Sequence, residues 1–346
     1  MLKLSKAHWS FGLIMLFLIL LLLFWIGSRP PRVLVIQSYS LDYPWTADLD
    51  QAIHKVLDQK PYETHWLFMD TKRNPDAASK QAAGEKARAL IEEWEPEIIL
   101  TVDDNAQEYV AKHYVDNEDI QIVFSGVNKD PRTYGYTNAS NVTGLRERLD
   151  YINIKSLLFY LLPAGQRNFI HISDNTASSQ GRRKELEAFN WKPLEFKGSV
   201  QVTTFDEWKQ AIKAADKIAK VLVLTQYHTI LRAQDSNERV PPSEIISWTQ
   251  KNSKLLMIGL FIFHVKTGGT IAVGPNPQEH GYDAANRVIA LLEKNTTPRA
   301  LGIQDNKDFI LFMRNKDDSI SKRSLEKLDL SIIYDAYALM GQKRLE

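Results

Sequence analysis

The sequence predicts an α/β protein with two doubly wound, parallel-sheet lobes that are joined by a hinge and preceded by one N-terminal transmembrane helix. Three observations lead to this fold class. An uncharged apolar run occupies Phe11–Ile26. From Arg32 onward, short apolar stretches alternate with amphipathic helical patterns, which is typical of parallel sheets covered by helices. The alternation restarts after the polar segment Lys129–Asn141, so we expect a second lobe.

The apolar run is long enough to cross a membrane. Extended to Ala7–Gly27, it reaches the roughly 20 residues that a helix needs to span the bilayer core. Because the run is apolar on every face, it does not fit a helix packed on a soluble core. A cleaved signal peptide is the alternative, but no small-x-small cleavage site follows Ile26. We therefore expect residues 1–31 to form a tail, an uncleaved anchor and a short linker.

The charges on the two sides of the apolar run favour opposite orientations in the membrane. Lys3 and Lys6 favour a cytoplasmic N-terminus, whereas Arg29 and Arg32 oppose it. A short tail is the easier end to leave inside, so we expect the chain from about residue 32 onward to be exported. The absence of cysteine permits either compartment.

Composition excludes several classes of function. Lys and Arg number 43 and Asp and Glu 42, so the chain lacks the basic excess expected of a nucleic-acid binder. The sequence has no cysteine ligand, no His-x-x-x-His pair, no Gly-x-Ser-x-Gly elbow and no Walker loop. We therefore expect no cofactor and no enzymatic activity.

The first module contains four apolar stretches separated by helical patterns. The stretch RVLVIQSY is β-rich, and EIILTV and IQIVFS have the composition of buried strands. Helix 77–94 ends before Pro96, as helices do. The predicted strands are 32–39, 62–69, 97–102 and 120–125, and the predicted helices are 47–59, 77–94 and 105–115.

The second module repeats the pattern over a longer stretch. Its predicted strands are 167–173, 200–204, 221–225, 255–259, 270–273 and 308–314. Its predicted helices are 153–162, 178–189, 207–218, 242–252 and 277–294, with a final one from 321. We assign residues 32–144 and 266–304 to lobe 1 and residues 145–265 and 305–346 to lobe 2. The hinge crossings are then expected near 142–145, 265–269 and 301–308.

Polar side chains follow the predicted strands at the point where each strand ends. Ligands of parallel sheets bind outside these carboxyl ends, where helix N-termini also offer free N–H groups. The loop Tyr43-Pro44-Trp45-Thr46 adds rings on which a ligand can stack, although it could instead pack on its own lobe. The predicted ligand contacts are Ser38, Tyr39, Tyr43, Trp45, Thr46, Asp103, Asp104, Asn105, Ser125, Asn128, Asp174, Asn175, Gln226, Tyr227 and Phe261.

Several of these segments together resemble a known family. The segments are Val33–Thr46, Glu97–Ala106, Ile122–Asn128, Asn141–Leu145 and Val273–Gly281. They resemble the substrate-binding-protein-like periplasmic receptors of ABC transporters, which have the type I periplasmic-binding fold. The resemblance implies a clam-shaped periplasmic receptor that closes on a small polar ligand. Free receptors of this kind are usually cleaved or lipidated at a cysteine, which this chain lacks.

The resulting hypothesis is a receptor that is anchored in the inner membrane through residues 7–27, with its C-terminal domain in the periplasm. It would feed a membrane transporter or signal to a sensor kinase or cyclase. The alternative is a membrane-tethered glycosyltransferase in which Asp103 and Asp104 hold a metal ion. In a simpler interpretation, Asp104 or Asn105 only caps the next helix. A scaffold that has lost its ligand is the third possibility.

Overall fold

The computed structural model describes residues 14–19, 29–162 and 165–313. Most of the predicted anchor and the predicted helix from residue 321 lie outside these residues. Ile14–Ile19 is helical, and its side chains are 45–62% exposed. In the described part of the chain, no helix is both long and apolar enough to cross a membrane.

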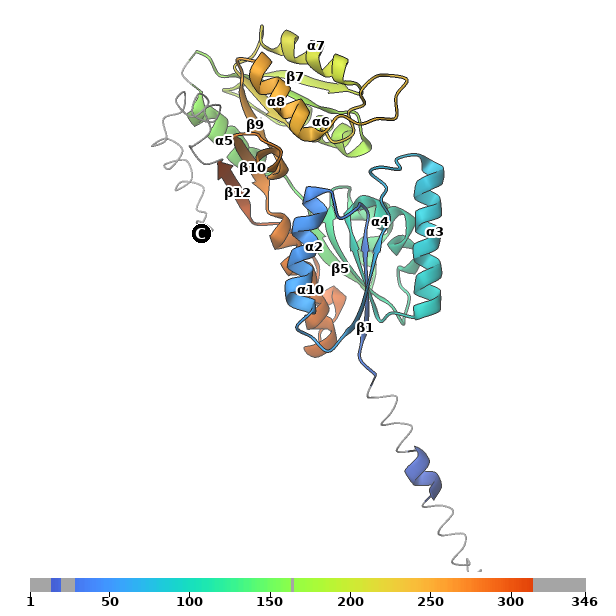
Figure 1. Ribbon diagram of the computed structural model, residues 1–346. Coiled ribbons are helices and arrows are strands. Elements are labelled where there is room, and N and C mark those ends of the chain that lie inside the picture. Colours follow the sequence, from blue (N-terminus) through green and yellow to red (C-terminus); the bar gives the residue numbers. More distant parts are fainter. Residues whose placement is uncertain (1–13, 20–28, 163–164, 314–346) are drawn as a thin grey trace, which may run out of the picture.

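Lobe 1 is an all-parallel six-stranded sheet between two layers of helices (Figure 1). Its strands are β1 (Arg32–Gln37), β2 (Glu63–Phe68), β3 (Ile98–Val102), β4 (Gln121–Val127), β5 (Val142–Arg146) and β11 (Ile303–Asp305), in the order β11-β5-β4-β3-β1-β2. Its helices are α2 (Pro44–Leu57), α3 (Ala77–Trp94), α4 (Asp103–Tyr109), α10 (Pro277–Glu293) and α11 (Pro298–Leu301).

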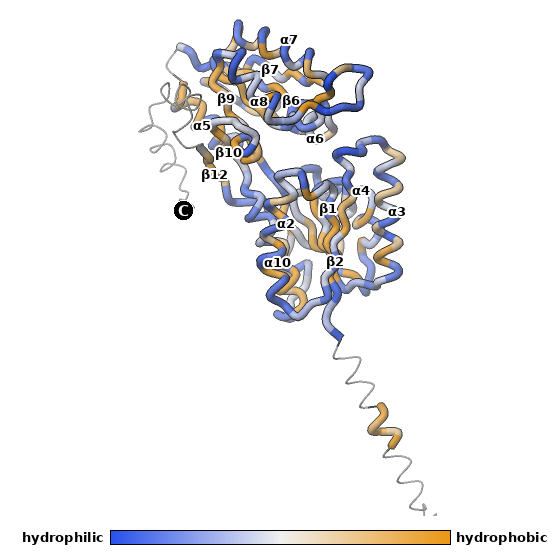
Figure 2. The backbone as a smooth tube through the Cα atoms, in the orientation of Figure 1, coloured by the Kyte–Doolittle hydropathy of each residue, from blue (hydrophilic) through white to orange (hydrophobic). Residues whose placement is uncertain are grey.

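Alternating residues of β1 divide the core of lobe 1 between the two faces of its sheet. Val33 and Val35 pack with residues of α2 and α10, whereas Leu34 and Ile36 pack with residues of α3 and α4. Helix α10 approaches α2 so closely that a Cβ on Gly281 would lie 2.2 Å from the carbonyl oxygen of Leu49. The apolar residues accordingly gather on the strands and on the inner sides of the helices (Figure 2).

Lobe 2 is a second six-stranded sheet with one antiparallel edge strand. Its strands are β6 (Asn168–Asp174), β7 (Glu195–Val202), β8 (Val221–Leu224), β9 (Leu256–Gly259), β10 (Ile271–Pro275) and β12 (Phe309–Met313), in the order β12-β10-β9-β8-β6-β7. Only β12 is antiparallel to its neighbour. Its helices are α5 (Tyr151–Leu161), α6 (Ala177–Ala188), α7 (Phe205–Ala215), α8 (Pro242–Asn252) and α9 (Phe263–Lys266). The predicted α/β class with two mostly parallel sheets is therefore confirmed.

One of the three crossings between the lobes differs from the predicted ones. Strand β10 pairs with β9 and β12, so residues 271–275 belong to the second sheet and not to lobe 1. The chain crosses after β5, between β10 and α10, and between β11 and β12. The expected crossing at 265–269 is instead a turn within lobe 2, because it joins α9 to β10. Strands β5 and β11 were not predicted.

Side chains cap several of the helices that follow the carboxyl ends of strands, although α2 and α4 have no such cap. Asp76 accepts a hydrogen bond from the Ser79 backbone N–H at the start of α3. Thr176 does the same for Ser179 at the start of α6, and Thr204 and Glu207 form a reciprocal capping box at α7. Each such cap contributes about 1 kcal/mol and fixes where the loop before the helix must run.

A buried histidine lies in the second sheet, on the strand next to the edge strand β7. His171 on β6 has no exposed surface; its Nδ1 lies 3.0 Å from Ser199 Oγ and its Nε2 2.9 Å from Thr225 Oγ1. Burial lowers the pKa of His171 to about 3. The unfolded chain has a histidine pKa of about 6.5. Below that pH the unfolded chain binds a proton that the folded chain does not, so the free energy of unfolding decreases as the pH decreases.

We predict that His171→Gln makes the free energy of unfolding less dependent on pH. Between pH 7.5 and 5.5, His171 should account for a loss of about 1.4 kcal/mol that the variant does not suffer. Urea titrations of both proteins at the two pH values measure this difference. Buried carboxylates affect both proteins alike, so an equal loss in the two would contradict the neutral state of His171.

Candidate ligand-binding cleft

A cavity of about 800 Å³ lies between the two lobes. Its walls come from the loops and helix N-termini at the carboxyl ends of both sheets. Lobe 1 contributes Tyr39, Thr71, Lys72, Pro75, Lys80, Asp104, Asn105, Asn128, Lys129 and Asp130. Lobe 2 contributes Asn175, Thr176, Ala177, Ser178, Gly181, Arg182, Glu185, Thr203, Thr229, Leu231 and Arg239. The two lobes therefore supply similar numbers of lining residues, most of which have polar or charged side chains.

The structure brings some of the predicted ligand contacts together at this wall. Tyr39, Asp104, Asn105, Asn128 and Asn175 line the cavity. The remaining predicted contacts are buried, at most 9% exposed, and do not line it. These buried residues are Ser38, Tyr43, Trp45, Thr46, Asp103, Ser125, Asp174, Gln226, Tyr227 and Phe261.

Some of the buried residues hold the wall in position from behind. The Ser38 hydroxyl accepts a hydrogen bond from the Ala106 backbone N–H at 2.8 Å, which ties the end of β1 to α4. Asp174 accepts hydrogen bonds from the hydroxyls of Thr176, Ser179 and Thr229. Because Thr176 caps α6, Asp174 fixes the amino end of that helix at the cleft.

The predicted stacking loop forms a seam between the lobes instead of a ligand wall. The ring of Trp45 lies 6.0 Å from that of Phe261, and Tyr43 lies 5.1 Å from His228 and 6.1 Å from Phe263. Tyr43 and Trp45 belong to lobe 1 and their partners to lobe 2. Aromatic rings at the start of α2 are close enough to the other lobe to be buried by it, so they pack there.

In the acidic pair that follows β3, the carboxylate of Asp104 is committed to protein donors. Asp104 accepts hydrogen bonds from the backbone N–H groups of Asn128 and Lys129 and from the Tyr134 hydroxyl, at 3.3, 3.0 and 2.8 Å. Asp103 is buried, and its burial raises its pKa well above the usual range, with Glu147 adding to the rise. Among the described residues no cluster of three or more His, Cys, Asp or Glu side chains could hold a metal ion. The geometry therefore does not favour the metal-dependent glycosyltransferase.

Sequence reasoning missed the cationic side chains of the cleft. Thr71 and Lys72 follow β2, a strand end whose polar residues were a usable signal. Arg182 lies in the second turn of α6, and Arg239 in the long connection between β8 and α8. No local sequence pattern marks either arginine, because Arg182 reaches the cavity from a helix of lobe 2 and Arg239 from a long loop.

The ammonium group of Lys72 rests on two tyrosine rings. Its Nζ lies 4.6 Å from the centroid of Tyr39 and 4.2 Å from that of Tyr43, within the range of a cation–π interaction. Burial lowers the pKa of Lys72, whereas the carboxylates of Asp174, Asp103 and Glu147 act to raise it. No carboxylate lies within ion-pair distance of Lys72 in the described chain.

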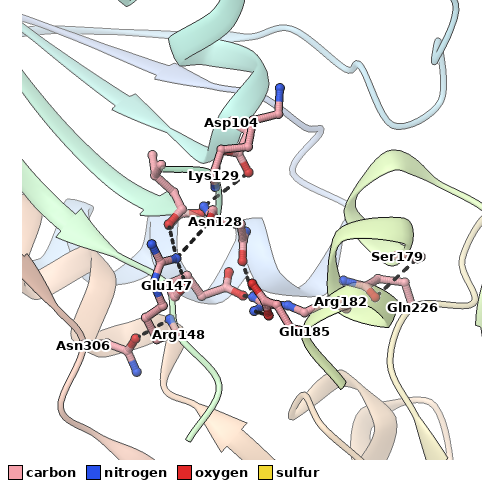
Figure 3. Close-up of polar contacts among 12 residues, drawn as sticks. Asp104, Asn128, Lys129, Glu147, Arg148, Ser179, Arg182, Glu185, Gln226 and Asn306 are labelled. Atoms are coloured by element: carbon pink, nitrogen blue, oxygen red, sulfur yellow. Dashed lines mark hydrogen bonds and ion pairs between the residues drawn. The ribbon is translucent and has the colours of Figure 1, made fainter. Parts of the chain in front are cut away.

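A buried ion pair joins α6 of lobe 2 to lobe 1 (Figure 3). Arg182 is bonded to Glu147, just after β5, and to the side chain of Asn128, and its Nη1 lies 2.9 Å from Glu185 Oε2. The side chains of Arg182 and Glu147 are only 3% and 5% exposed. Burial raises the pKa of Glu147, and Arg182 opposes that rise. Removing either partner would leave a buried charge without compensation.

We predict that Arg182→Met lowers the free energy of unfolding by about 3–5 kcal/mol. Adding Glu147→Gln to that variant should recover part of the loss, because the uncompensated carboxylate is then gone. Urea unfolding of the wild type, both single variants and the double variant measures the coupling. The matched control is Arg183→Met, whose exposed pair with Glu187 should contribute at most about 1 kcal/mol. Equal losses for Arg182→Met and Arg183→Met would contradict this role.

Two α/β lobes, connected by three crossings and enclosing a polar cleft, define the class of type I periplasmic-binding folds. Known structures agree. A conserved domain protein from Vibrio cholerae superposes with a TM-score of 0.66 at 15% identity, covering 88% of this chain and 98% of that one. A Streptococcus pneumoniae ABC domain in complex with L-Trp gives 0.62 at 13% identity, covering 87% and 98%. A ligand-free, open substrate-binding protein from Clostridium difficile gives 0.60 at 13%, covering 91% and 96%.

At these low identities, the TM-scores establish a shared fold. No family model matches the sequence, and no curated protein matches it either. The chain therefore has the two-lobed architecture of the substrate-binding proteins that it resembles.

Proposed function

We propose that this protein is a non-enzymatic receptor that binds a small polar ligand between its lobes and closes around it. The observation that carries the proposal is the cavity of about 800 Å³, lined by polar side chains from both lobes at the carboxyl ends of their strands. Ligands of open parallel sheets bind at that edge, and a volume of this size suits a metabolite. Neighbouring structures described as an L-Trp complex and as an open, ligand-free substrate-binding protein support it.

Closure would come from hinge bending at the three crossings. On the cavity side, Arg239 of lobe 2 donates to the carbonyl oxygens of Lys72 and Arg73 of lobe 1, at 3.2 and 2.9 Å. The aromatic seam of Tyr43 and Trp45 lies behind the cavity. A ligand that contacts both walls would favour the closed state by its difference in affinity for the two states.

We further propose that the receptor is anchored in the inner membrane and presents its lobes to the periplasm. The support is the apolar run Phe11–Ile26, together with the exposed apolar side chains of Ile14–Ile19. The amino end of β1 at Arg32 lies at the opposite end of the sheet from the cleft (Figure 1). Lobe 1 would then sit nearer the membrane, with the cleft open to solvent and beside an integral membrane transporter or sensor.

The receptor proposal predicts that a ligand raises the melting temperature and reduces the radius of gyration of the full-length protein. At 100 times its dissociation constant, a ligand raises the free energy of unfolding by about 2.7 kcal/mol. In a chain of this size, that corresponds to a rise of about 5 °C in the melting temperature. Thermal shift and small-angle scattering across amino acids, amines, nucleosides, sugars and organic acids measure both. Failure of every compound to change either quantity would contradict the proposal.

A variant that fills the cleft provides a matched control for this screen. Gly181 faces the cavity from α6, and nothing lies within 4 Å of the position that its Cβ would take. Gly181→Trp should therefore fold normally and lose the ligand response. Lys184→Trp, on the exposed side of the same helix, should keep it. Loss of the response in both variants would show that it does not depend on the cleft.

The anchoring proposal predicts a periplasmic C-terminus. Alkaline phosphatase fused after Glu346 should be active, and β-galactosidase at the same position inactive. The protein should also remain in the membrane fraction after an alkaline carbonate wash. Active β-galactosidase would contradict export, and release by the wash would contradict the anchor.

A further inference from the structure

The carboxylates in the cavity wall already have partners. Asp104 accepts the three protein hydrogen bonds described above. Asp130 pairs with Arg132, and Glu185 pairs with Arg182 and also accepts from the Tyr151 hydroxyl. A cationic ligand would have to compete with these donors for every acidic group on the wall.

Several cations in the same wall have no such partner. Lys72, Lys80 and Arg239 line the cavity, and within the described chain none has a carboxylate within 4.0 Å. Lys129 is only loosely paired, with its Nζ 3.7 Å from Glu108. The wall therefore offers uncommitted positive charge and no uncommitted negative charge.

Lys72 also fills the place where a ligand ammonium would otherwise be stabilised. The faces of Tyr39 and Tyr43, with the buried carboxylates of Asp103 and Asp174 nearby, form a favourable environment for a cation. The chain supplies that cation itself. A ligand amine would meet an occupied aromatic site and a like charge.

Arg239 lies beside Lys72 at the same corner of the cleft. Arg239 lies in a segment that two isolated β-bridges hold in place, one between Leu231 and Thr204 and one between Leu231 and Arg239. Its Nη2 donates to the Lys72 and Arg73 carbonyl oxygens, whereas its Nε and Nη1 make no hydrogen bond in the described residues. The N–H groups of those two nitrogens therefore remain available to donate to an anion.

The amino end of α6 faces this corner from lobe 2. Asn175, Thr176, Ala177 and Ser178 all line the cavity. Asp174, which holds that helix end, acts electrostatically on both Lys72 and Arg239, so the three groups are close together. The helix dipole at that end adds to the positive potential of the two side chains, and the buried Asp174 carboxylate offsets part of it.

We propose that the ligand carries an anionic group, a carboxylate or a phosphate, that binds between Lys72 and Arg239 of opposite lobes and the amino end of α6. The inference rests on the proposed receptor function and specifies its ligand class. Because Lys72 and Arg239 come from different lobes, one anion can engage both and stabilise the closed state.

The test is a ligand screen sorted by charge, using the full-length protein at pH 7.5. The screen compares compounds that share a carbon skeleton and differ in charge: succinate with succinamide and putrescine, and glucose 6-phosphate with glucose. These compounds belong to a wider set of carboxylates, phosphates, neutral compounds and amines. Compounds that raise the melting temperature should fall in the anionic arms, and the carboxylate and phosphate arms distinguish the two sources. Binding confined to neutral or cationic compounds would overturn this inference and leave the receptor proposal standing. No binding in any arm would contradict the receptor proposal, and this inference with it.

Variants connect the response to the named residues. Lys72→Met and Arg239→Gln should each weaken anion binding by about tenfold to hundredfold, the loss expected for one charge-assisted hydrogen bond. Lys72→Arg should restore most of it. Lys86→Met, an exposed lysine of α3 outside the cavity, is the matched control and should bind like the wild type. Unchanged anion affinity in both Lys72→Met and Arg239→Gln would overturn the proposal. Because Arg239 lies in a surface loop, Arg239→Gln should fold and give a usable test even if Lys72→Met folds poorly.

Discussion

A parallel sheet gathers the carboxyl ends of all its strands at one edge, and in this chain the two such edges face each other. That constraint determines where the polar loops, the helix N-termini and the cavity lie. The crossings after β5, before α10 and between β11 and β12 maintain it, since each passes through the narrow region where the lobes meet. The aromatic seam and the buried Arg182–Glu147 pair then fix the lobes beside the crossings.

The contacts between the lobes fall into two kinds. Behind the cavity, aromatic side chains of both lobes form one continuous apolar cluster. Around the cavity, the contacts are polar: a buried ion pair at Glu147 and hydrogen bonds from the Arg239 side chain to backbone carbonyl oxygens. Apolar packing around the cavity would resist separation of the lobes, whereas the polar groups found there can exchange protein partners for water or for a ligand. The molecule thus combines a persistent seam with a wall that a ligand can complete.

Much of the fold followed from hydrophobic periodicity. The missed strand β5 shows where that signal fails: Gly144 weakens the pattern, yet it is required because a Cβ there would lie 2.3 Å from the Phe124 carbonyl oxygen. Membership of β10 in the second sheet was also beyond local patterns. At the site, the strand-end rule found Tyr39, Asp104 and Asn128, because these follow directly from topology. It missed Arg239 and misplaced Trp45, since long or large side chains act across the gap between lobes.

The central claim is that the lobes close on a ligand, and a distance across the cleft tests it most directly. The chain has no cysteine, so Lys86→Cys on α3 and Lys184→Cys on α6 would carry the only two spin labels. Pulsed electron paramagnetic resonance would compare the full-length protein with and without a saturating compound from the charge-sorted screen. The account predicts a shorter and narrower distance distribution with the bound anion. An unchanged distribution at saturation would contradict closure.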